Sequence, residues 1–203
     1  MYKLYDFLPS GNGYKVRLVL TQLQIPFELI ELDILKQETR TAEFLAKNPN
    51  GKIPLLEIAP DKYISESNAI IYYLSQGTEY FPQEKYQQAQ VMQWLFFEQY
   101  SHEPNLATPR FWITELKQAD KYQKEIEQKR KLGYAALNVM EQHLKIHDFF
   151  VANKYSIADI ALYAYTHVAE EGGFDLSKFP AILAWFKRIE SQPRYIKISD
   201  RPN

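Results

Sequence analysis

Residues 48–57 read Asn48-Pro49-Asn50-Gly51-Lys52-Ile53-Pro54-Leu55-Leu56-Glu57, and this stretch decides how the first part of the chain folds. The segment Pro49-Asn50-Gly51 is a turn signal. Pro54 comes directly before an apolar run, and because proline has no N–H to give to a sheet, it favours the start or the edge of a strand. The Ile53–Pro54 bond is also where a cis peptide costs least. A cis bond would turn the backbone of Ile53 outward, where its N–H and C=O could pair with an extended ligand.

A second signal follows shortly after this stretch. Tyr63-Ile64-Ser65 predicts a short strand, and Glu66-Ser67-Asn68 opens a helix whose apolar residues recur at helical spacing. The first turn of a helix carries unpaired N–H groups and the positive end of the helix dipole, which suit a carboxylate. On the residues alone, an ordinary turn, an edge strand and a capped helix are an equal alternative to a binding site.

The residues around these signals alternate between strands and helices. Strands are expected at Tyr2–Phe7 and Phe27–Leu32, and a helix over Tyr14–Gln24 lies between them, so the two strands should be parallel with a right-handed crossover. Three further elements are a short helix, an antiparallel hairpin and another helix, at Thr41–Ala46, Leu55–Ile58 with Tyr63–Ser65, and Ser67–Ser75. The predicted order is β-α-β-α-β-β-α, a compact α/β domain.

After Gly77 the pattern becomes entirely helical. Helices are expected over Tyr86–Ser101, Leu106–Leu116, Lys121–Ile146 and Phe179–Ser191, and Pro104 is expected to break the first two apart. One more helix starts after Ser156, where Ser156 and Asp159 have the spacing of a capping box.

Composition narrows the classes of function. The chain has 203 residues, a formal net charge of −1 and no cysteine. The absence of cysteine excludes disulfides, thiolate metal sites and a protein thiol nucleophile. The 4 histidines lack ligand spacing, so no metal is expected, and the near-neutral charge gives no support for nucleic-acid or membrane binding. No segment approaches the length of a membrane span, so a cytoplasmic protein is expected.

The loop after the first strand carries the main candidates for chemistry. Ligands of open α/β sheets gather at the carboxyl ends of the strands, and Ser10 and Asn12 lie there, near a helix N-terminus. Gly11 and Gly13 would allow close approach of the backbone, but the phosphate-loop pattern is absent. The alternative is that Ser10 only caps the helix.

The chain resembles a cytosolic glutathione transferase along essentially its whole length. The matching segments are Ser10–Arg17, Asn48–Pro54, Glu66-Ser67 and the Ser156/Asp159 box, in family order. The resemblance implies an α/β plus all-α fold: a thioredoxin-like N-terminal domain (residues 1–76), a linker (77–84) and an all-helical C-terminal domain (85–203).

The resemblance also implies roles for single residues. Pro54 matches the family's cis-proline, and Ile53 would pair by its backbone with the cysteinyl part of glutathione. Ser67 would hold the γ-glutamyl carboxylate, with Glu66 near the amino group. The glycine carboxylate would meet a basic side chain, Lys52 or, as a second candidate, Arg40.

Two residues are candidates for the side chain that lies by the glutathione sulfur. Ser10 matches the catalytic serine of the theta-, zeta-, phi-, tau- and chi-like classes, whose hydroxyl favours the glutathione thiolate. The segment Asn12–Val16 also resembles nu-class and Ure-type relatives, in some of which an asparagine lies by the sulfur and disulfide reduction is the stronger activity. Ser10 is preferred.

A second substrate would bind between the domains. The candidates for lining that pocket are Tyr14, Tyr100, His102 and Phe111. For such aromatic residues, helix–helix core is the alternative role.

The implied function is conjugation of the glutathione thiolate, as co-substrate, to small electrophiles such as isothiocyanates, organic halides or peroxides. The implied protein is a cytoplasmic, homodimeric detoxification enzyme. Two other functions remain open: a glutathione-dependent disulfide reductase, and a non-catalytic module of the same fold that binds another protein.

Overall fold

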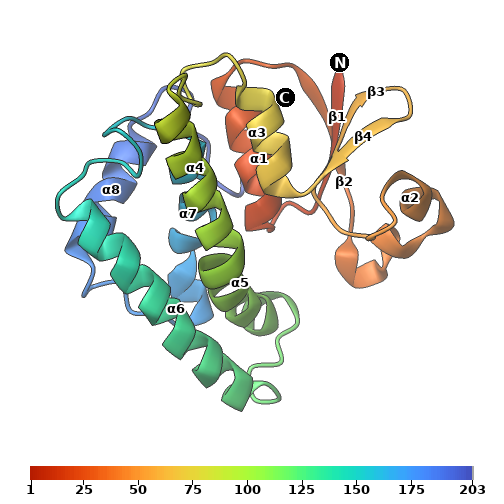
Figure 1. The fold of residues 1–203 in the computed structure, drawn as a ribbon. Coiled ribbons are helices and arrows are strands. Elements are labelled where there is room, and N and C mark those ends of the chain that lie inside the picture. The colour runs from red at the N-terminus through yellow and green to blue at the C-terminus, as the bar shows by residue number, and fades with distance from the viewer. Residues whose placement is uncertain (203) are drawn as a thin grey trace. The chain divides into compact units, whose positions relative to one another are not determined.

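The computed structural model describes residues 1–202, and these form two compact units (Figure 1). The first unit contains Met1–Gln76 together with the chain terminus from Pro193 onward. The second unit is Gly77–Gln192. The expected combination of an α/β region and an all-helical region is therefore confirmed.

The first unit is built on a four-stranded sheet with the strand order β2-β1-β3-β4. The strands are β1 (Tyr2–Asp6), β2 (Phe27–Glu31), β3 (Leu55–Ala59) and β4 (Lys62–Ser65). As predicted, β1 and β2 are parallel, and β3 and β4 form an antiparallel hairpin. β3 also pairs antiparallel with β1, with Leu56 opposite Leu4. The order of elements is that of a thioredoxin-like domain.

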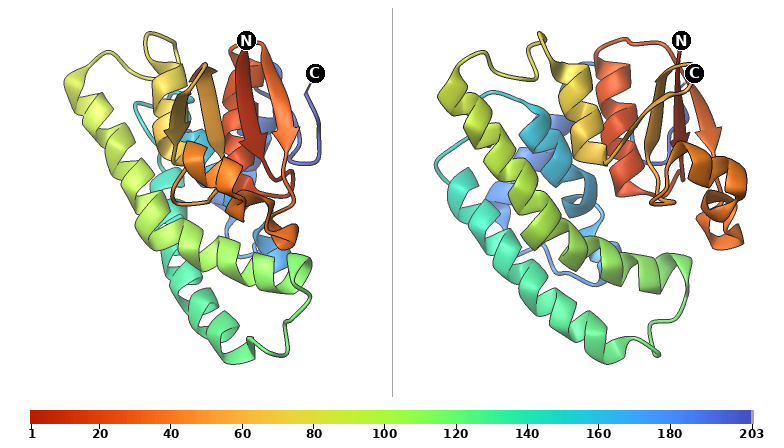
Figure 2. Two further views of the ribbon diagram at one scale, coloured as in Figure 1. Left: turned by 90° about the vertical axis from the view of Figure 1, so that its right-hand side faces the viewer. Right: turned by 45° about the vertical axis from the view of Figure 1, so that its right-hand side comes forward.

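Helices cover both faces of this sheet. Side chains alternate between the faces of a strand. Tyr5 and Leu55 therefore share one face, where Phe44 of α2 (Ala42–Lys47) packs against them. The other face is covered by α1 (Gly11–Gln22) and α3 (Ser67–Ser75), which lie side by side (Figure 2). Two short 3₁₀ turns, η1 (Ile34–Lys36) and η2 (Glu38–Arg40), precede α2.

The second unit is arranged around α7, every residue of which is buried. Its helical elements are α4 (Lys85–Phe97), η3 (Glu98–His102), α5 (Glu103–Arg110), η4 (Phe111–Glu115), α6 (Gln123–Leu144), α7 (Ile157–Thr166), η5 (Ala169–Gly172) and α8 (Pro180–Glu190). The predicted capping box is confirmed: Ser156 caps α7 and the Asp159 carboxylate accepts from the Ser156 N–H. The Asp159 carboxylate also accepts from the N–H of Phe150 and the indole of Trp185, so the box joins three segments.

The prediction that Pro104 breaks the helix is wrong. The helical path runs without interruption from α4 through η3, α5 and η4. Pro104 stands in the first turn of α5, and η3, directly before it, is a π-helix. A proline in a helix removes one i→i−4 hydrogen bond and crowds the preceding turn. The wider π turn lies at that preceding turn, which relieves the crowding.

The last segment of the chain lies on the first unit. The sequence placed it with the helical region 85–203, but from Pro193 onward its contacts are with the first unit. Arg17 of α1 donates to the backbone oxygens of Ile198 and Asp200, and the hydroxyl of Tyr14 donates to Ile196 O at 2.7 Å. These partners lie more than 180 positions apart in the sequence, which is why no local pattern indicated them.

Candidate functional site

The loop between β1 and α1 is fixed by its own hydrogen bonds. Ser10 is the N-cap of α1: its side-chain oxygen accepts from the N–H of Gly13 at 3.3 Å, and its own N–H donates to Phe7 O at 2.7 Å. A Cβ atom at Gly13 would lie 1.6 Å from Oδ1 of Asp6, so only glycine fits there. The cap and the glycine together place Ser10 and Asn12 at the carboxyl end of β1, as expected.

A buried ion pair supports this loop from below. Nε of Arg17 lies 2.9 Å from Oδ2 of Asp6, and both side chains are inaccessible to solvent. Arg17 also donates to Leu8 O at 2.6 Å, which ties α1 to the loop. Burial raises the pKa of Asp6 to about 7, against the opposing effect of the neighbouring guanidinium.

A network of hydrogen-bonded polar side chains joins the loop to the start of α3. The hydroxyl of Ser67 donates to Oδ1 of Asn12 at 3.1 Å. The ammonium of Lys15 donates to the Ser67 hydroxyl at 3.2 Å and to Oδ1 of Asn68 at 3.3 Å. Lys15 is completely buried and Ser67 nearly so. Two predicted site residues, Asn12 and Ser67, are therefore in direct contact although 55 positions separate them.

The start of α3 has an unusual backbone. Glu66, the residue before the helix, has φ of 67° and ψ of 113°, and its side chain is exposed. A positive φ is costly for a residue with a Cβ atom, and such residues concentrate at functional sites. This conformation presents the Glu66 side chain and the first N–H groups of α3 at the same end of the helix.

The stretch at residues 48–54 adopts the predicted conformation. The Ile53–Pro54 bond is cis, as expected. Within residues 1–202 the N–H and C=O of Ile53 make no hydrogen bond. The turn before it is held by Asn48, whose amide donates to Lys52 O at 2.8 Å. Lys52 itself is exposed.

Arg40 lies against this turn. Its guanidinium donates to Asn50 O at 3.1 Å. Gly51 has φ of 62°, and a Cβ atom added there would lie 2.4 Å from Nη1 of Arg40. Arg40 and Lys52 therefore lie at the same turn. They are the two basic residues predicted as alternative partners of the glycine carboxylate.

Of the four residues predicted to line a second-substrate pocket, two have completely buried side chains. Tyr14 is completely buried in the first unit, with its hydroxyl bonded to the terminal segment. His102 is completely buried in the second unit, where Nε2 lies 2.8 Å from the hydroxyl of Thr166. Both side chains therefore have the burial of core residues. Phe111 is partly exposed at the start of η4, and Tyr100 is 88% exposed.

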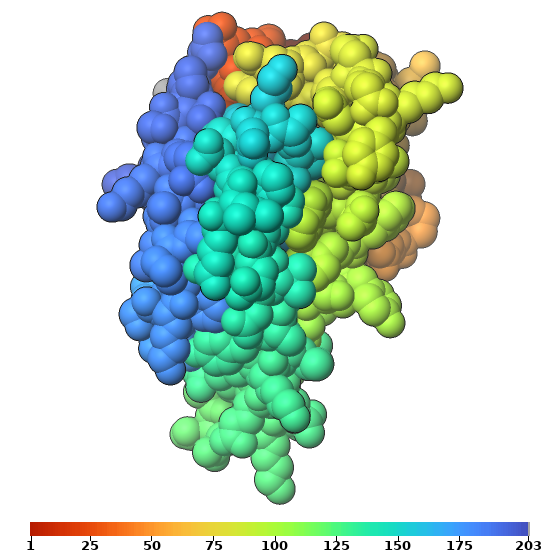
Figure 3. Space-filling view, turned by 60° about the vertical axis from the view of Figure 1, so that its left-hand side comes forward, coloured from red at the N-terminus to blue at the C-terminus, as the bar shows by residue number. Residues whose placement is uncertain are grey.

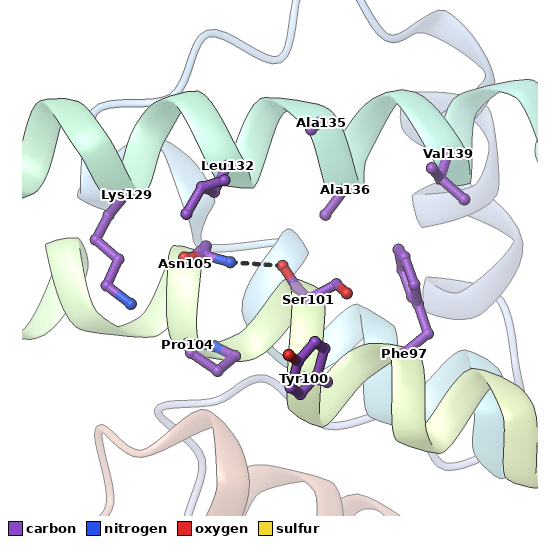
Figure 4. Close-up of a pocket in the computed structure, with 10 residues that line it drawn as sticks. All are labelled: Phe97, Tyr100, Ser101, Pro104, Asn105, Lys129, Leu132, Ala135, Ala136 and Val139. Atoms are coloured by element: carbon purple, nitrogen blue, oxygen red, sulfur yellow. Dashed lines mark hydrogen bonds between the residues drawn. The ribbon is translucent and has the colours of Figure 1, made fainter.

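Tyr100 lines a groove of about 500 Å³ in the second unit. The groove lies between the helical run α4–α5 and α6 (Figure 4). Its lining side chains are Phe97, Tyr100, Ser101, Pro104, Asn105, Lys129, Leu132, Ala135, Ala136 and Val139. Figure 3 shows the surfaces of α4 and α6 beside each other on one face. Within this unit the groove is open to solvent and mostly apolar.

Sequence reasoning missed the buried supports of the first loop. Lys15, Arg17 and Asp6 were given no structural role from the sequence, although all three are fully buried, which is rare for charged residues. The one available signal was position: all three flank the glycine loop, next to the carboxyl end of β1.

Two features are absent from residues 1–202. No three His, Cys, Asp or Glu side chains come together in an arrangement that could hold a metal ion. Nor does any described helix combine the length and apolar character needed to cross a bilayer.

Comparison with known proteins identifies the family. Residues 1–76 match the glutathione S-transferase N-terminal domain, and residues 89–193 match the glutathione S-transferase C-terminal domain. The chain therefore belongs to the glutathione S-transferase family.

Among solved structures, a possible glutathione S-transferase from Rhodopseudomonas palustris is 50% identical, with a TM-score of 0.97 over 99% of both chains. Ure2p in complex with glutathione is 26% identical, with a TM-score of 0.85 over 95% of both chains. Among curated proteins, the disulfide-bond oxidoreductase YfcG of Escherichia coli is 30% identical over 95% of this chain and 92% of its own length.

Proposed function

We propose that this protein is a glutathione transferase that binds glutathione in its first unit. The observation that carries the proposal is the hydrogen bond between Ser67 and Asn12, because it joins the expected γ-glutamyl end of the site to the expected sulfur end. The unpaired N–H and C=O of Ile53 support it, since they suit the backbone of the cysteinyl residue.

Each end of glutathione then has a partner of suitable charge. The γ-glutamyl carboxylate takes the Ser67 hydroxyl and the first N–H groups of α3, where the helix dipole is positive. Its amino group lies near the exposed carboxylate of Glu66. At the other end, Lys52 or Arg40 pairs with the glycine carboxylate.

The chemical task of the site is to favour the thiolate. A free thiol has a pKa of about 8.5, so only a few per cent is ionised at neutral pH. Lowering that pKa by about 2 units requires roughly 2.7 kcal/mol of differential stabilisation. A donated hydrogen bond from Ser10 and the positive end of α1 together supply energies of that order. The thiolate then attacks the electrophile, with proximity contributing the rest of the rate.

The test is to follow the ultraviolet absorbance of the bound thiolate against pH. Wild type is expected to show a thiolate pKa about 2 units below that of free glutathione. Ser10→Ala should return the pKa most of the way to 8.5 and lower turnover with an aryl halide or an isothiocyanate. An unchanged thiolate pKa in Ser10→Ala would remove Ser10 from the mechanism.

A glutathione-dependent disulfide reductase is the second candidate. Asn12 favours it, because it lies in the loop after β1 with its Oδ1 accepting from Ser67, and a side-chain amide is a group that can donate to a sulfur. The likeness to the disulfide-bond oxidoreductase YfcG favours it as well. Hydroxyethyl disulfide and an aryl halide, assayed side by side, separate the two reactions. Asn12→Ala should impair disulfide reduction more than conjugation if Asn12 serves that reaction.

A non-catalytic binding module is the third candidate. A failure of glutathione to bind at millimolar concentration, which titration calorimetry measures directly, would favour it. Whichever candidate holds, a cytoplasmic location follows only from the family resemblance, and fractionation of the source cells tests it.

We further propose that the protein is a homodimer formed through the groove of the second unit. The side chains around the groove are apolar yet exposed: Leu132 is 54% exposed and Val139 48%. Leu132→Glu should convert a dimer into a monomer in sedimentation velocity, because a charge buried in an interface is costly. Ile146→Glu, at a site 78% exposed just beyond α6, is the matched control and should leave the dimer intact.

A further inference from the structure

We propose that Arg17 is a positioning residue for Ser10, and that the terminal segment of the chain (residues 193–202) sets the orientation of its guanidinium. The inference rests on the proposed transferase function, in which Ser10 donates to the glutathione sulfur. It gives a part in that function to a segment that follows the helices of the second unit in the sequence but belongs to the first unit.

Arg17 holds the residues that lead into Ser10. Its Nη2 donates to Leu8 O at 2.6 Å, and its Nε lies 2.9 Å from Oδ2 of Asp6. The other carboxylate oxygen of Asp6 accepts from the N–H of Phe7 at 2.7 Å, and the N–H of Ser10 donates to Phe7 O at 2.7 Å. The backbone before Ser10 is therefore bound to the guanidinium directly and through Asp6. A shift of the guanidinium would move Ser10 with it.

The terminal segment binds the other side of the same guanidinium. Nη1 of Arg17 donates to Ile198 O and to Asp200 O, each at 2.9 Å, so both of its hydrogens are used. A guanidinium is planar and its donors form a rigid fork, so two bonds at Nη1 also fix the directions of Nη2 and Nε. The side chain of Arg17 is inaccessible to solvent, and protein groups alone therefore set its orientation.

The terminal segment is shaped to present these two carbonyls. The carboxylate of Asp200 accepts from the N–H of Lys197 at 2.8 Å, and the N–H of Asp200 donates to Lys197 O at 3.0 Å. The resulting turn brings two carbonyls, two positions apart, to one nitrogen. On either side of the turn, Arg194 donates to the last backbone carbonyl of α1 at 3.2 Å, and Arg201 forms two hydrogen bonds with the carboxylate of Glu31. The segment is thus anchored on the first unit at both ends, independently of Arg17.

This support should act on the thiolate more than on the binding of glutathione. A hydrogen bond weakens steeply as it lengthens or bends, so a displaced Ser10 stabilises the thiolate less. The rest of glutathione is held in the proposed site by Ser67 and Ile53, which belong to other segments of the first unit. Ionisation of the thiol and the affinity for glutathione are therefore expected to respond differently when Arg17 is changed.

The first test is Arg17→Lys, which keeps a positive charge beside Asp6 but replaces the fork with a single nitrogen. The thiolate pKa of bound glutathione, followed by ultraviolet absorbance, should rise by about 1 unit from the wild-type value of about 6.5. At pH 6, kcat should then fall roughly eightfold, because the ionised fraction falls by that factor. At pH 9 the thiol is ionised in both proteins, and kcat should agree within about twofold. The Kd for glutathione should change less than about threefold.

The second test changes the terminal segment and leaves Arg17 in place. Asp200→Ala removes the acceptor that closes the turn, whereas Asp200→Asn removes the same charge but keeps an oxygen for the N–H of Lys197. Asp200→Ala should raise the thiolate pKa by roughly half a unit, and Asp200→Asn should match wild type. Because Asp200 is exposed, this pair also decides the matter if Arg17→Lys does not fold.

A third variant controls for general damage to the first unit. Leu20→Ala removes a fully buried side chain near the other end of α1. It should lower the melting temperature and leave the thiolate pKa unchanged. Loss of folded protein lowers turnover equally at pH 6 and pH 9, which distinguishes it from the loss expected for Arg17→Lys.

The proposed function and the inference fail in different ways. If the wild type does not bind glutathione, or binds it without lowering the thiolate pKa, the proposed function fails and the inference fails with it. If Ser10→Ala raises the thiolate pKa but Arg17→Lys and Asp200→Ala do not, the role of Arg17 is overturned while the proposed function stands. A rise in Arg17→Lys alone would overturn the role of the terminal segment.

Discussion

Arg17 offers the sharpest test of how the first unit is held together. Its guanidinium pairs with Asp6 at 2.9 Å and donates to Leu8 O at 2.6 Å and to the oxygens of Ile198 and Asp200, both at 2.9 Å. Replacing Arg17 with methionine keeps most of the buried volume and removes all four contacts. The Asp6 carboxylate then has no counter-ion.

The magnitude depends on pH, because Asp6 titrates. With its pKa raised by burial to about 7, Asp6 is mostly protonated in the folded protein at pH 5 and mostly ionised at pH 8. At pH 5 the loss is that of hydrogen bonds to neutral groups, ~2 kcal/mol in the free energy of unfolding. In Arg17→Met the Asp6 carboxyl has no counter-ion and stays protonated above pH 7. Each pH unit above 7 therefore adds about 1.4 kcal/mol to the loss in the free energy of unfolding. The expected loss at pH 8 is therefore ~3 kcal/mol, at the lower end of the range for a broken buried ion pair.

Urea denaturation at both pH values measures this loss. Arg201→Met is the matched control: Arg201 also ties the terminal segment to the sheet, through Glu31, but both side chains are more than 40% exposed. Exposed pairs contribute at most ~1 kcal/mol, with little dependence on pH in this range. The reasoning fails if Arg17→Met costs no more than Arg201→Met at pH 8, or if its cost is the same at pH 5 and pH 8.

Two further predictions concern the second unit. Burial lowers the pKa of His167 to about 4. Below pH 6.5 the imidazole of His167 is therefore protonated in the unfolded chain but stays neutral in the folded protein until the pH approaches 4. Stability from this group is present above pH 6.5 and is lost as the pH falls towards 4. Because the ring is only partly buried, we expect the wild type to lose ~2 kcal/mol more than His167→Gln over this interval in urea denaturation. Asp159→Asn should cost ~2–4 kcal/mol, because an amide N–H₂ would face the donors of Ser156 or Trp185. A thermal or urea unfolding curve within 1 kcal/mol of wild type would contradict this.

Local sequence patterns predicted an element of the fold well where a single cause, such as alternation or a turn signal, determines it. The two strands at Tyr2 and Phe27 and the hairpin from Leu55 follow from alternation and turn residues, and the structure has all four. The start of α1 was placed three residues late, at Tyr14, because apolar spacing does not register Gly11-Asn12-Gly13. Ser10 as a cap was the better marker of that boundary.

Sequence reasoning failed where distant residues decide the outcome. Tyr14 was expected in a pocket because its phenol lies near the glycine loop, but a carbonyl 182 positions away takes its hydroxyl. His102 is likewise buried against Thr166, which is 64 positions away. Lys15 gave no signal as a buried cation, because its partner Ser67 lies 52 positions further along the chain. Side-chain partners of this kind depend on the packing of segments that are far apart in the sequence, which no local pattern encodes.

For Ser10, the observed helix cap is compatible with the proposed catalytic role. A hydroxyl has two lone pairs and one proton. The cap uses a lone pair, which accepts from the N–H of Gly13. Within residues 1–202 the proton is donated to no other group, so it is available for a glutathione sulfur. Sequence reasoning had treated the two roles as alternatives.

A pair of substitutions separates the two roles of Ser10. Ser10→Ala removes the cap and the proton, whereas Ser10→Asp keeps a capping oxygen and removes the proton. Ser10→Ala should therefore lose ~1 kcal/mol of stability and Ser10→Asp almost none. Catalysis should follow the other order: both variants should lose thiolate stabilisation, and Ser10→Asp should lose more because its carboxylate repels the thiolate. If Ser10→Asp restored both stability and the low thiolate pKa, Ser10 would be a cap alone, and activation of the sulfur would pass to Asn12.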